Sequence, residues 1–299
     1  MRVKIFLILI LVSFNLIAQN AGNTGYSFLK IGTGAGEVAQ AEAITSKLIS
    51  PFSLNYNPAL ITQANFSSIG FMHNEWIQDL RSEYLVANSS LYGIPIFLSV
   101  NSTSISNIEI RTKPGEAQGT FNAQYFFAGL GTGYEIFENL SLGFQIKYLY
   151  ENIYVDESNG YAFDFGLFKK NLIADLNAGL SLRNFGKVNK LSTTSSELPS
   201  EVRFGLSYFG NLSLYKFNFY PSLDLQKFTR SGNLNFLIGL ETNYDKLLTF
   251  RIGYNSMREI NHVSFGVGVS YKSIYVDYAF LPFTNNFGSA NLISIYIKL

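Results

Sequence analysis

The segment from Leu140 to Glu151, LSLGFQIKYLYE, decides the fold because its apolar side chains recur at every second position. One face of the segment carries Leu142, Phe144, Ile146, Tyr148 and Tyr150, and the other carries Ser141, Gly143, Gln145, Lys147 and Glu151. A period of two is that of a β-strand, whereas a helix repeats every 3.6 residues. About ten residues is also the length that a tilted strand needs to cross a membrane.

The same pattern repeats from about residue 66 to the end of the chain. A soluble β-sandwich can show this alternation, but segments so long, so aromatic and so numerous favour a transmembrane barrel. We therefore predict an all-β, 14-stranded antiparallel transmembrane β-barrel over residues 66–299. The predicted strands begin near Phe66, Leu80, Ile94, Phe121, Leu140, Gly160, Ile173, Glu201, Tyr215, Asn233, Leu248, Val263, Ile274 and Ala290.

The connections between these segments alternate in length. Most of those after odd-numbered strands are long and polar, above all 104–120 and 185–200, and 156–159 is another. Those after even-numbered strands, such as 169–171 and 272–273, are tight. Long outer loops that alternate with short periplasmic turns are typical of outer-membrane barrels, and a sandwich has no reason to keep this order.

Alternation also assigns each side chain to lipid or lumen. Rows such as Val263, Phe265, Val267 and Val269 should face lipid, and charges of both signs should face inward, because a charge at mid-membrane costs about 2–4 kcal/mol. The predicted inward charges are Arg81, Glu83, Lys147, Glu151, Asp164, Asp175, Arg183, Arg203, Lys216, Asp224, Glu241, Arg251 and Asp277. Glycines crowd the inward face too, which indicates either a filled lumen or a strongly curved wall.

The first 65 residues do not alternate. Residues 1–18, with Arg2, Lys4 and an apolar run from Ile5 to Ile17, have the layout of a signal peptide, and this run is too short for a membrane-spanning helix. Residues 19–65 are too few for a domain of their own, so we predict that they pack in the barrel interior or at its periplasmic mouth as a hatch. The expected location is the bacterial outer membrane.

Composition excludes several classes of function. The chain has no cysteine, so it has neither disulfides nor thiolate metal sites. Its 22 basic and 21 acidic residues give a net charge of +1 without a basic run, so no nucleic-acid partner is expected. The glycines of Gly32–Gly36 lack the spacing and context of a phosphate loop. We expect no cofactor and no metal.

Catalysis is not expected either. The only histidines, His73 and His262, have no Gly-x-Ser-x-Gly motif beside them, so an outer-membrane hydrolase has little support. Trp76, with Tyr84 and Tyr92, is assigned to an interfacial aromatic girdle.

Several motifs carry a family resemblance. They are Gly25–Gly34 (GYSFLKIGTG), Asn57-Pro58-Ala59, His73-Asn74-Glu75-Trp76, Gly119-Thr120-Phe121, Ala162-Phe163-Asp164-Phe165-Gly166, Leu182-Arg183-Asn184-Phe185-Gly186, Leu198-Pro199, Val276-Asp277-Tyr278-Ala279-Phe280 and Ser294. In these motifs the chain resembles the PorV/PorQ family of outer-membrane proteins, which are relatives of FadL-type barrels. The chain departs from the family at Gly36, Ala41 and Glu42 in the hatch and at Leu299, where an aromatic residue is common.

The resemblance implies a 14-stranded barrel with an N-terminal hatch, and some family members serve type IX secretion. On this basis Asn57, Pro58, Asp164, Arg183 and Asp277 are candidate hatch or lumen contacts. The alternative for the three charged residues is a salt-bridge network within the wall.

Two functions follow. The first is a non-enzymatic accessory or cargo-binding component of type IX secretion, with secretion-system subunits or cargo proteins and outer-membrane lipid as partners. The second is a FadL-type transporter of a hydrophobic small molecule, for which an apolar pocket beside the hatch is the distinguishing feature.

Overall fold

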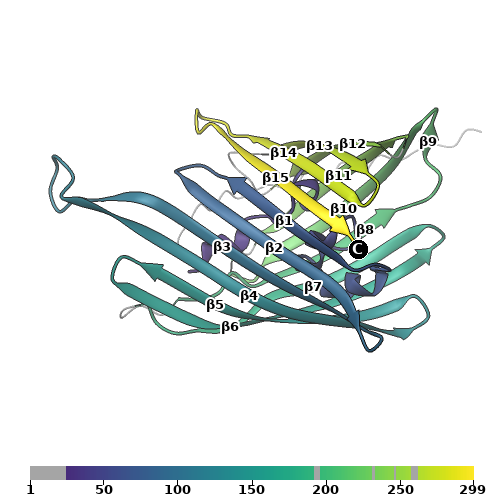
Figure 1. Cartoon of the computed structure of the whole chain (residues 1–299), viewed down its shortest axis with the longest axis horizontal. Helices are drawn as coiled ribbons and strands as arrows, with labels where there is room; N and C mark the ends of the chain where they lie inside the picture. Colours follow the sequence, from purple (N-terminus) through teal and green to yellow (C-terminus); the bar gives the residue numbers. More distant parts are fainter. Residues whose placement is uncertain (1–24, 192–195, 231–232, 246, 257–261) are drawn as a thin grey trace, which may run out of the picture.

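The computed structural model describes residues 25–191, 196–230, 233–245, 247–256 and 262–299. In these residues a single antiparallel sheet closes on itself, because β1 pairs with β15 and β10 pairs with β11. The strands are β1 (Ser68–Glu75), β2 (Leu80–Leu91), β3 (Ile94–Ile110), β4 (Gly119–Phe137), β5 (Leu140–Ile153), β6 (Asp156–Ile173), β7 (Leu176–Val188), β8 (Glu201–Tyr208), β9 (Ser213–Leu214), β10 (Phe217–Phe228), β11 (Leu234–Tyr244), β12 (Leu248–Asn255), β13 (Val263–Tyr271), β14 (Ile274–Pro282) and β15 (Ser289–Lys298). β9 is a two-residue extension beside β10, so the closed barrel has fourteen strands (Figure 1).

The outer surface of the barrel is apolar. On β11, Leu234, Phe236 and Ile238 are about half exposed, whereas Asn235 and Leu237 between them are buried. The same alternation recurs on β5 and β13. Because every strand is paired on both sides and the outer side chains are apolar, the barrel meets the requirements for crossing a lipid bilayer.

The two ends of the barrel differ. At one end, here called the turn end, strands are joined by short turns such as 92–93, 138–139 and 272–273. At the other, the loop end, the longer connections 111–118, 189–200 and 283–288 occur. The predicted alternation of connection lengths is therefore confirmed for most hairpins.

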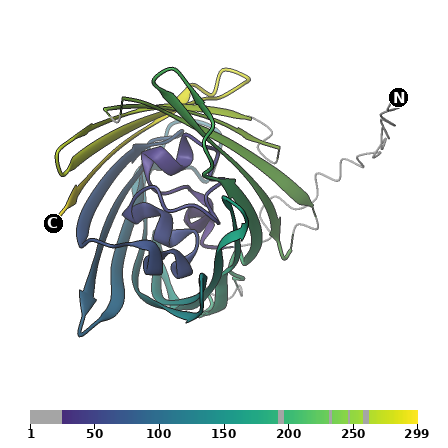
Figure 2. The same ribbon diagram turned by 90° about the vertical axis from the view of Figure 1, so that its right-hand side faces the viewer.

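Within residues 25–65, four short helices precede β1 and lie inside the barrel, as the view in Figure 2 shows. They are η1 (Ser27–Lys30), α1 (Ala35–Val38), η2 (Pro51–Asn55) and η3 (Pro58–Gln63). Ser50 and Asn57 cap the last two through side-chain oxygens that accept from the amides of Phe52 and Ala59. A proline directly follows each cap, where its missing amide costs nothing. None of the helices in the described ranges is long and apolar enough to span a membrane.

Some local predictions were wrong. The connection expected at 156–159 is part of β6, and the turn is formed by Tyr154 and Val155. The turn expected at 169–171 lies at 174–175, where Ala174 has a φ of 51°. At the first place the polar residues Asp156 to Asn159 continue the pairing with β5. At the second, β6 runs past its last pair with β5 at Lys169 to Ile173, which pairs with Leu176 after a register shift.

The facing predicted for β2 was inverted. Ser82, Tyr84 and Val86 are buried in the lumen, so Arg81 and Glu83 point outward near the loop end. Tyr84 is therefore a lumen residue rather than an interfacial one. Arg81 and Glu83 are tolerated on the outer face because the free-energy cost of a lipid-facing charge falls toward zero near the membrane interface. Asp175 and Lys216, also predicted to point inward, are exposed in turns.

Candidate functional site

The lumen is occupied by residues 25–65, here called the lumenal segment. Its aromatic rings pack against the barrel wall: Phe28 stacks on Tyr125 with ring centroids 5.4 Å apart, and Phe52 lies 5.9 Å from Tyr84. A second apolar cluster joins Leu54, Ala59, Leu60 and Ile61 to Phe97 and Phe168 of the wall. Two separate apolar contacts thus hold the segment in place.

Wall glycines lie where the lumenal segment approaches most closely. A Cβ at Gly143 would be 2.1 Å from the Ala59 amide nitrogen, and one at Gly179 would be 2.2 Å from the Thr45 carbonyl oxygen. Gly253 faces the Ala41 amide at the same 2.2 Å. The sequence left two explanations for these glycines, and close packing of a filled lumen explains these three.

Tyr56 is held between two buried arginines of the wall. The guanidinium carbons of Arg183 and Arg203 lie 5.3 and 5.4 Å from the centre of its ring, in the range of cation–π attraction. Glu201 forms ion pairs with both arginines, and Arg203 also pairs with Glu42 of the lumenal segment at 3.2 Å. Charges from segment and wall therefore neutralise one another directly.

Asp224 of β10 binds the backbone of the lumenal segment. One carboxylate oxygen accepts from the amides of Ile44 and Thr45 at 3.1 and 2.9 Å. Next to this contact the hydroxyls of Ser46 and Ser207 are hydrogen bonded at 3.0 Å. This part of the segment has no regular helix, so the wall satisfies backbone groups that would otherwise be buried unpaired.

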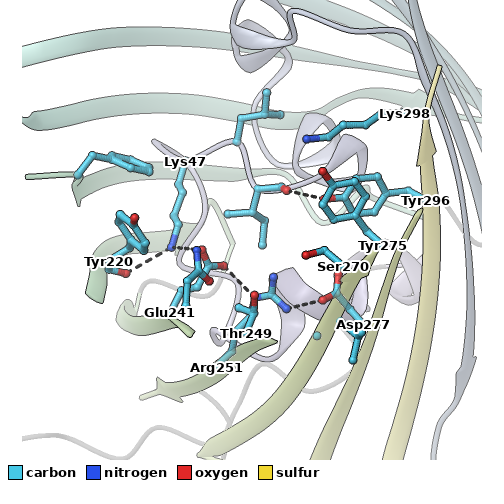
Figure 3. Close-up of a pocket in the computed structure, with 16 residues that line it drawn as sticks. Lys47, Tyr220, Glu241, Thr249, Arg251, Ser270, Tyr275, Asp277, Tyr296 and Lys298 are labelled. Atoms are coloured by element: carbon cyan, nitrogen blue, oxygen red, sulfur yellow. Dashed lines mark hydrogen bonds and ion pairs between the residues drawn. The ribbon is translucent and has the colours of Figure 1, made fainter. Parts of the chain in front are cut away.

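A chain of charges runs from the lumenal segment across β11, β12 and β14 (Figure 3). Lys47 lies 3.8 Å from Glu241, Glu241 accepts from Arg251 at 2.9 Å, and Arg251 donates to Asp277 at 2.5 Å. Burial lowers the pKa of Lys47 to about 8, against the attraction of Glu241, which raises it.

Glu37 of α1 is a buried acid beside this chain. Its carboxylate accepts from Ser50 and Ser53 at 2.5 and 2.8 Å. Burial raises the pKa of Glu37 to about 7, and the two serine hydrogen bonds offset this only in part. The carboxyl thus links α1 to η2 within the lumenal segment.

A cavity of about 400 Å³ lies between Lys47–Ile49 of the lumenal segment and the wall near the turn end (Figure 3). Tyr275 and Tyr296 form one side, with parallel rings 4.4 Å apart, and Phe209 and Tyr220 form another. The charged residues on its surface are Lys47, Glu241, Arg251, Asp277 and Lys298. The arrangement can hold a small molecule that combines flat apolar and polar parts.

The predicted site residues lie at different places in the lumen. Asn57 and Pro58 start η3, and the Asn57 amide donates to the carbonyl oxygens of Thr45 and, in the wall, Leu167 at 2.7 and 3.1 Å. Asp164 pairs with Lys147 at 2.6 Å and accepts from the Asn184 amide, which are both wall contacts. Arg183 takes part in the Tyr56 contact, so it belongs to wall and segment alike.

Asp277 lies on the cavity, paired with Arg251 near Gly36. Trp76 follows β1 at the loop end, where its ring packs edge-on against Phe283, with centroids 5.3 Å apart, and against the apolar cluster inside the barrel.

Other residues of the site were not selected from the sequence. Arg203, Asp224, Glu241 and Arg251 were assigned to the lumen by alternation, but nothing in the sequence pointed to their partners. Tyr56 and Lys47 lie in the non-alternating segment, where no periodic pattern indicated their contacts.

Within the residues that the structure describes, no cluster of three or more His, Asp or Glu side chains could hold a metal ion. His73 pairs with Glu83 at 3.2 Å on the outer face, and His262 contacts the Asn255 carbonyl oxygen.

These features define a class of protein: a closed, fourteen-stranded antiparallel β-barrel with an apolar outer surface and a lumen occupied by its own N-terminal segment. No protein-family model matches the chain, and no curated protein matches its sequence.

Solved structures of similar fold give more particular likenesses. The toluene transporter TodX of Pseudomonas putida matches with a TM-score of 0.64 and 12% identity, over 90% of this chain and 99% of that one. The CymD monoaromatic hydrocarbon channel matches with a TM-score of 0.58 and 12% identity, over 90% and 98%. At such low identity these matches show the fold alone. They support the closed fourteen-stranded barrel fold, and both the relation to FadL-type barrels and the narrower PorV/PorQ membership stay predictions.

Proposed function

We propose that this protein resides in the bacterial outer membrane and carries a largely hydrophobic small molecule across it, with residues 19–65 acting as a hatch. The turn end then faces the periplasm, as in barrels of this type. The observation that carries the proposal is the cavity between the lumenal segment and the wall. Four aromatic rings and five charged side chains line it, so it is an amphipathic pocket rather than the apolar one expected from the sequence. The fold shared with hydrocarbon channels supports it by analogy.

The proposal requires the lumenal segment to move, because at present it fills the lumen. Ser46 and Ser207 allow this to be tested, since their hydroxyl oxygens are 3.0 Å apart and the chain has no cysteine. The paired changes Ser46→Cys and Ser207→Cys should form a disulfide that fixes the segment to β8. A matched control is Ser67→Cys with Ser89→Cys, whose hydroxyls are 2.9 Å apart without involving the segment.

The measurement is uptake of radiolabelled toluene by Gram-negative cells that express each variant. We expect uptake above that of cells without the protein, loss of this excess in the oxidised 46–207 variant, and recovery on reduction. The oxidised 67–89 control should retain full uptake. Uptake equal to that of empty cells for toluene, naphthalene and hexane alike would rule out a hydrocarbon channel, and unchanged uptake in the locked variant would rule out a moving hatch.

A secretion-associated role is the second candidate, and one feature favours it. The β3–β4 hairpin extends beyond its neighbours at the loop end (Figure 1), and its tip at residues 111–118 is exposed and polar. Such a hairpin offers a surface for a protein partner. Removal of residues 111–118 should abolish co-purification of a secretion-system subunit or cargo protein if this role is correct, and should leave toluene uptake unchanged.

A further inference from the structure

The charges around the cavity are unequal. Lys47 and Arg251 are neutralised by Glu241 and Asp277 through the ion pairs described above. The third cation, Lys298, forms no ion pair with any residue in the described part of the chain. The cavity surface therefore carries one positive charge in excess.

Lys298 is held by aromatic rings instead. Its ammonium lies 4.1 Å from the centre of the Phe66 ring and 4.6 Å from that of Tyr275. Alternation along β15 places Lys298 on the same inward face as Tyr296, and Figure 3 shows its ammonium directed over the cavity. Cation–π contacts fix the position of an ammonium group but leave its charge uncompensated. An anionic group that enters the cavity would meet a positioned cation.

The remaining surface suits a flat apolar body. Tyr275 and Tyr296 stack on each other, with Tyr296 buried and the Lys298 ammonium over Tyr275, so this pair borders the cavity without a free ring face. Phe209, which is partly exposed, and Tyr220, 5.8 Å away, present rings on another side. Aromatic rings prefer offset-stacked or edge-to-face contacts with one another, so an aromatic ligand gains more here than a flexible aliphatic chain. A volume of about 400 Å³ has room for one or two fused rings.

We infer that the cavity binds an aromatic carboxylate, with its ring against Phe209 and Tyr220 and its carboxylate on Lys298. The inference rests on the proposed function, because it names the class of molecule that the same lumen admits. Molecules that have only one of the two parts should bind less tightly. A neutral aromatic makes the ring contacts without the charge contact, and an aliphatic acid makes the charge contact without the ring contacts.

The test is equilibrium binding to the full chain in lipid nanodiscs, measured calorimetrically and corrected with empty nanodiscs. The probes are 2-naphthoate, the neutral 2-naphthylmethanol and octanoate. We expect 2-naphthoate to bind about five- to tenfold more tightly than 2-naphthylmethanol, which is the size of one partly exposed charge contact. It should also bind more tightly than octanoate, because octanoate makes the charge contact without the ring contacts. Its affinity should fall as salt is raised, whereas that of 2-naphthylmethanol should not.

The variant Lys298→Gln should lose this five- to tenfold advantage for 2-naphthoate and leave 2-naphthylmethanol within twofold. Lys272→Gln is the matched control, since Lys272 also lies over a tyrosine, Tyr271, with its ammonium 5.4 Å from the ring, but outside the cavity. It should change neither affinity.

Equal binding of the acid and the alcohol, salt-independent binding of the acid, or the same effect of both lysine variants would overturn the inference. Toluene uptake is measured on the same variants, so the two ideas can fail separately. Uptake without 2-naphthoate binding would reject the ligand class and leave the channel standing. Binding without uptake of any hydrocarbon would support the ligand class and reject passage.

Discussion

At the scale of single residues, buried charges position the lumenal segment. A charge away from water is costly unless it is paired and hydrogen bonded, and two of the buried ion pairs cross from the wall to the segment. Arg203 pairs with Glu42 and Lys47 with Glu241, in each case across the boundary between wall and segment. These pairs specify one docked position because a shifted segment would leave charges unpaired in the lumen.

Asp224 allows this to be tested. The change Asp224→Ala removes the acceptor for the amides of Ile44 and Thr45 and should weaken docking there by about 3 kcal/mol, because both amides stay buried. Amide hydrogen exchange should become faster at these two residues while β1 and β15 keep their protection. The control is Asp245→Ala in the β11–β12 turn, whose partner Lys216 is exposed, with an expected effect below about 1 kcal/mol. Unchanged exchange at Ile44 would contradict the role of Asp224.

At the scale of elements, η3 packs closely against β5 and β6 because the wall has glycines at the contact. The change Gly143→Ala would place a methyl group 2.1 Å from the Ala59 nitrogen, and backbone on both sides cannot yield. We expect η3 to be displaced while the barrel still forms, so protease should cut within residues 57–63 and toluene uptake should rise. Gly119→Ala is the control, because its nearest contact is the tip of Ile110 at 3.9 Å. Equal protease resistance in both variants would show that η3 is not seated as described.

The link between α1 and η2 should depend on pH through Glu37. Its pKa is about 7 when docked and 4.5 ordinarily, so the docked segment retains a proton that the undocked one releases. Docking is therefore most stable below about pH 4.5 and weakens as pH rises through about 7. Lys47, with a pKa of about 8 against 10.5 ordinarily, acts only at higher pH, where its loss of charge strengthens docking. The charged groups that act on the pKa of Glu37 are Asp277, which raises it, and Arg251, which lowers it.

The measurement is hydrogen exchange of residues 35–50 at pH 5 and pH 8, corrected for the intrinsic rate. Protection should be lower at pH 8 than at pH 5 in the natural protein, and this difference should be clearly smaller in Glu37→Gln, which keeps the serine contacts without a titrating proton. Glu138→Gln, in the exposed β4–β5 turn, should behave as the natural protein does. An undiminished pH effect in Glu37→Gln would assign it to another group.

The strands could be predicted from sequence because apolar residues recur at every second position wherever one face of a strand contacts lipid. The predicted starts lie within four residues of the observed ones, with Gly160 against Asp156 the largest difference. The predicted direction of the β2 side chains was wrong because Arg81 and Glu83 lie near the membrane interface, where a lipid-facing charge costs little free energy. The contacts of Tyr56 and Asp224 could not be predicted, since they join residues far apart in the chain through a segment without periodicity.

At the scale of the whole molecule, the apolar outer surface and the filled polar lumen together require a bilayer around the barrel. Val267 and Tyr271 lie on the same outer face of β13, Val267 in the middle of the strand and Tyr271 at its turn end. We predict that Val267→Arg lowers the free energy of unfolding in phospholipid vesicles by about 2–4 kcal/mol and Tyr271→Arg by about 0–1 kcal/mol, because the cost of a lipid-facing charge depends on its depth.

Denaturant titration of each variant in the same vesicles measures this difference, with tyrosine and tryptophan fluorescence as the signal of unfolding. The two substitutions introduce the same side chain on one strand and differ mainly in depth, so β-propensity and net charge largely cancel in the comparison. Equal losses in the free energy of unfolding at the two positions would mean that this face packs against protein rather than lipid. A loss at Val267 that persists in a detergent micelle too small to impose a fixed hydrocarbon thickness would mean the same. The outer surface would then be an interface, and passage through the lumen would have to be reconsidered with that partner present.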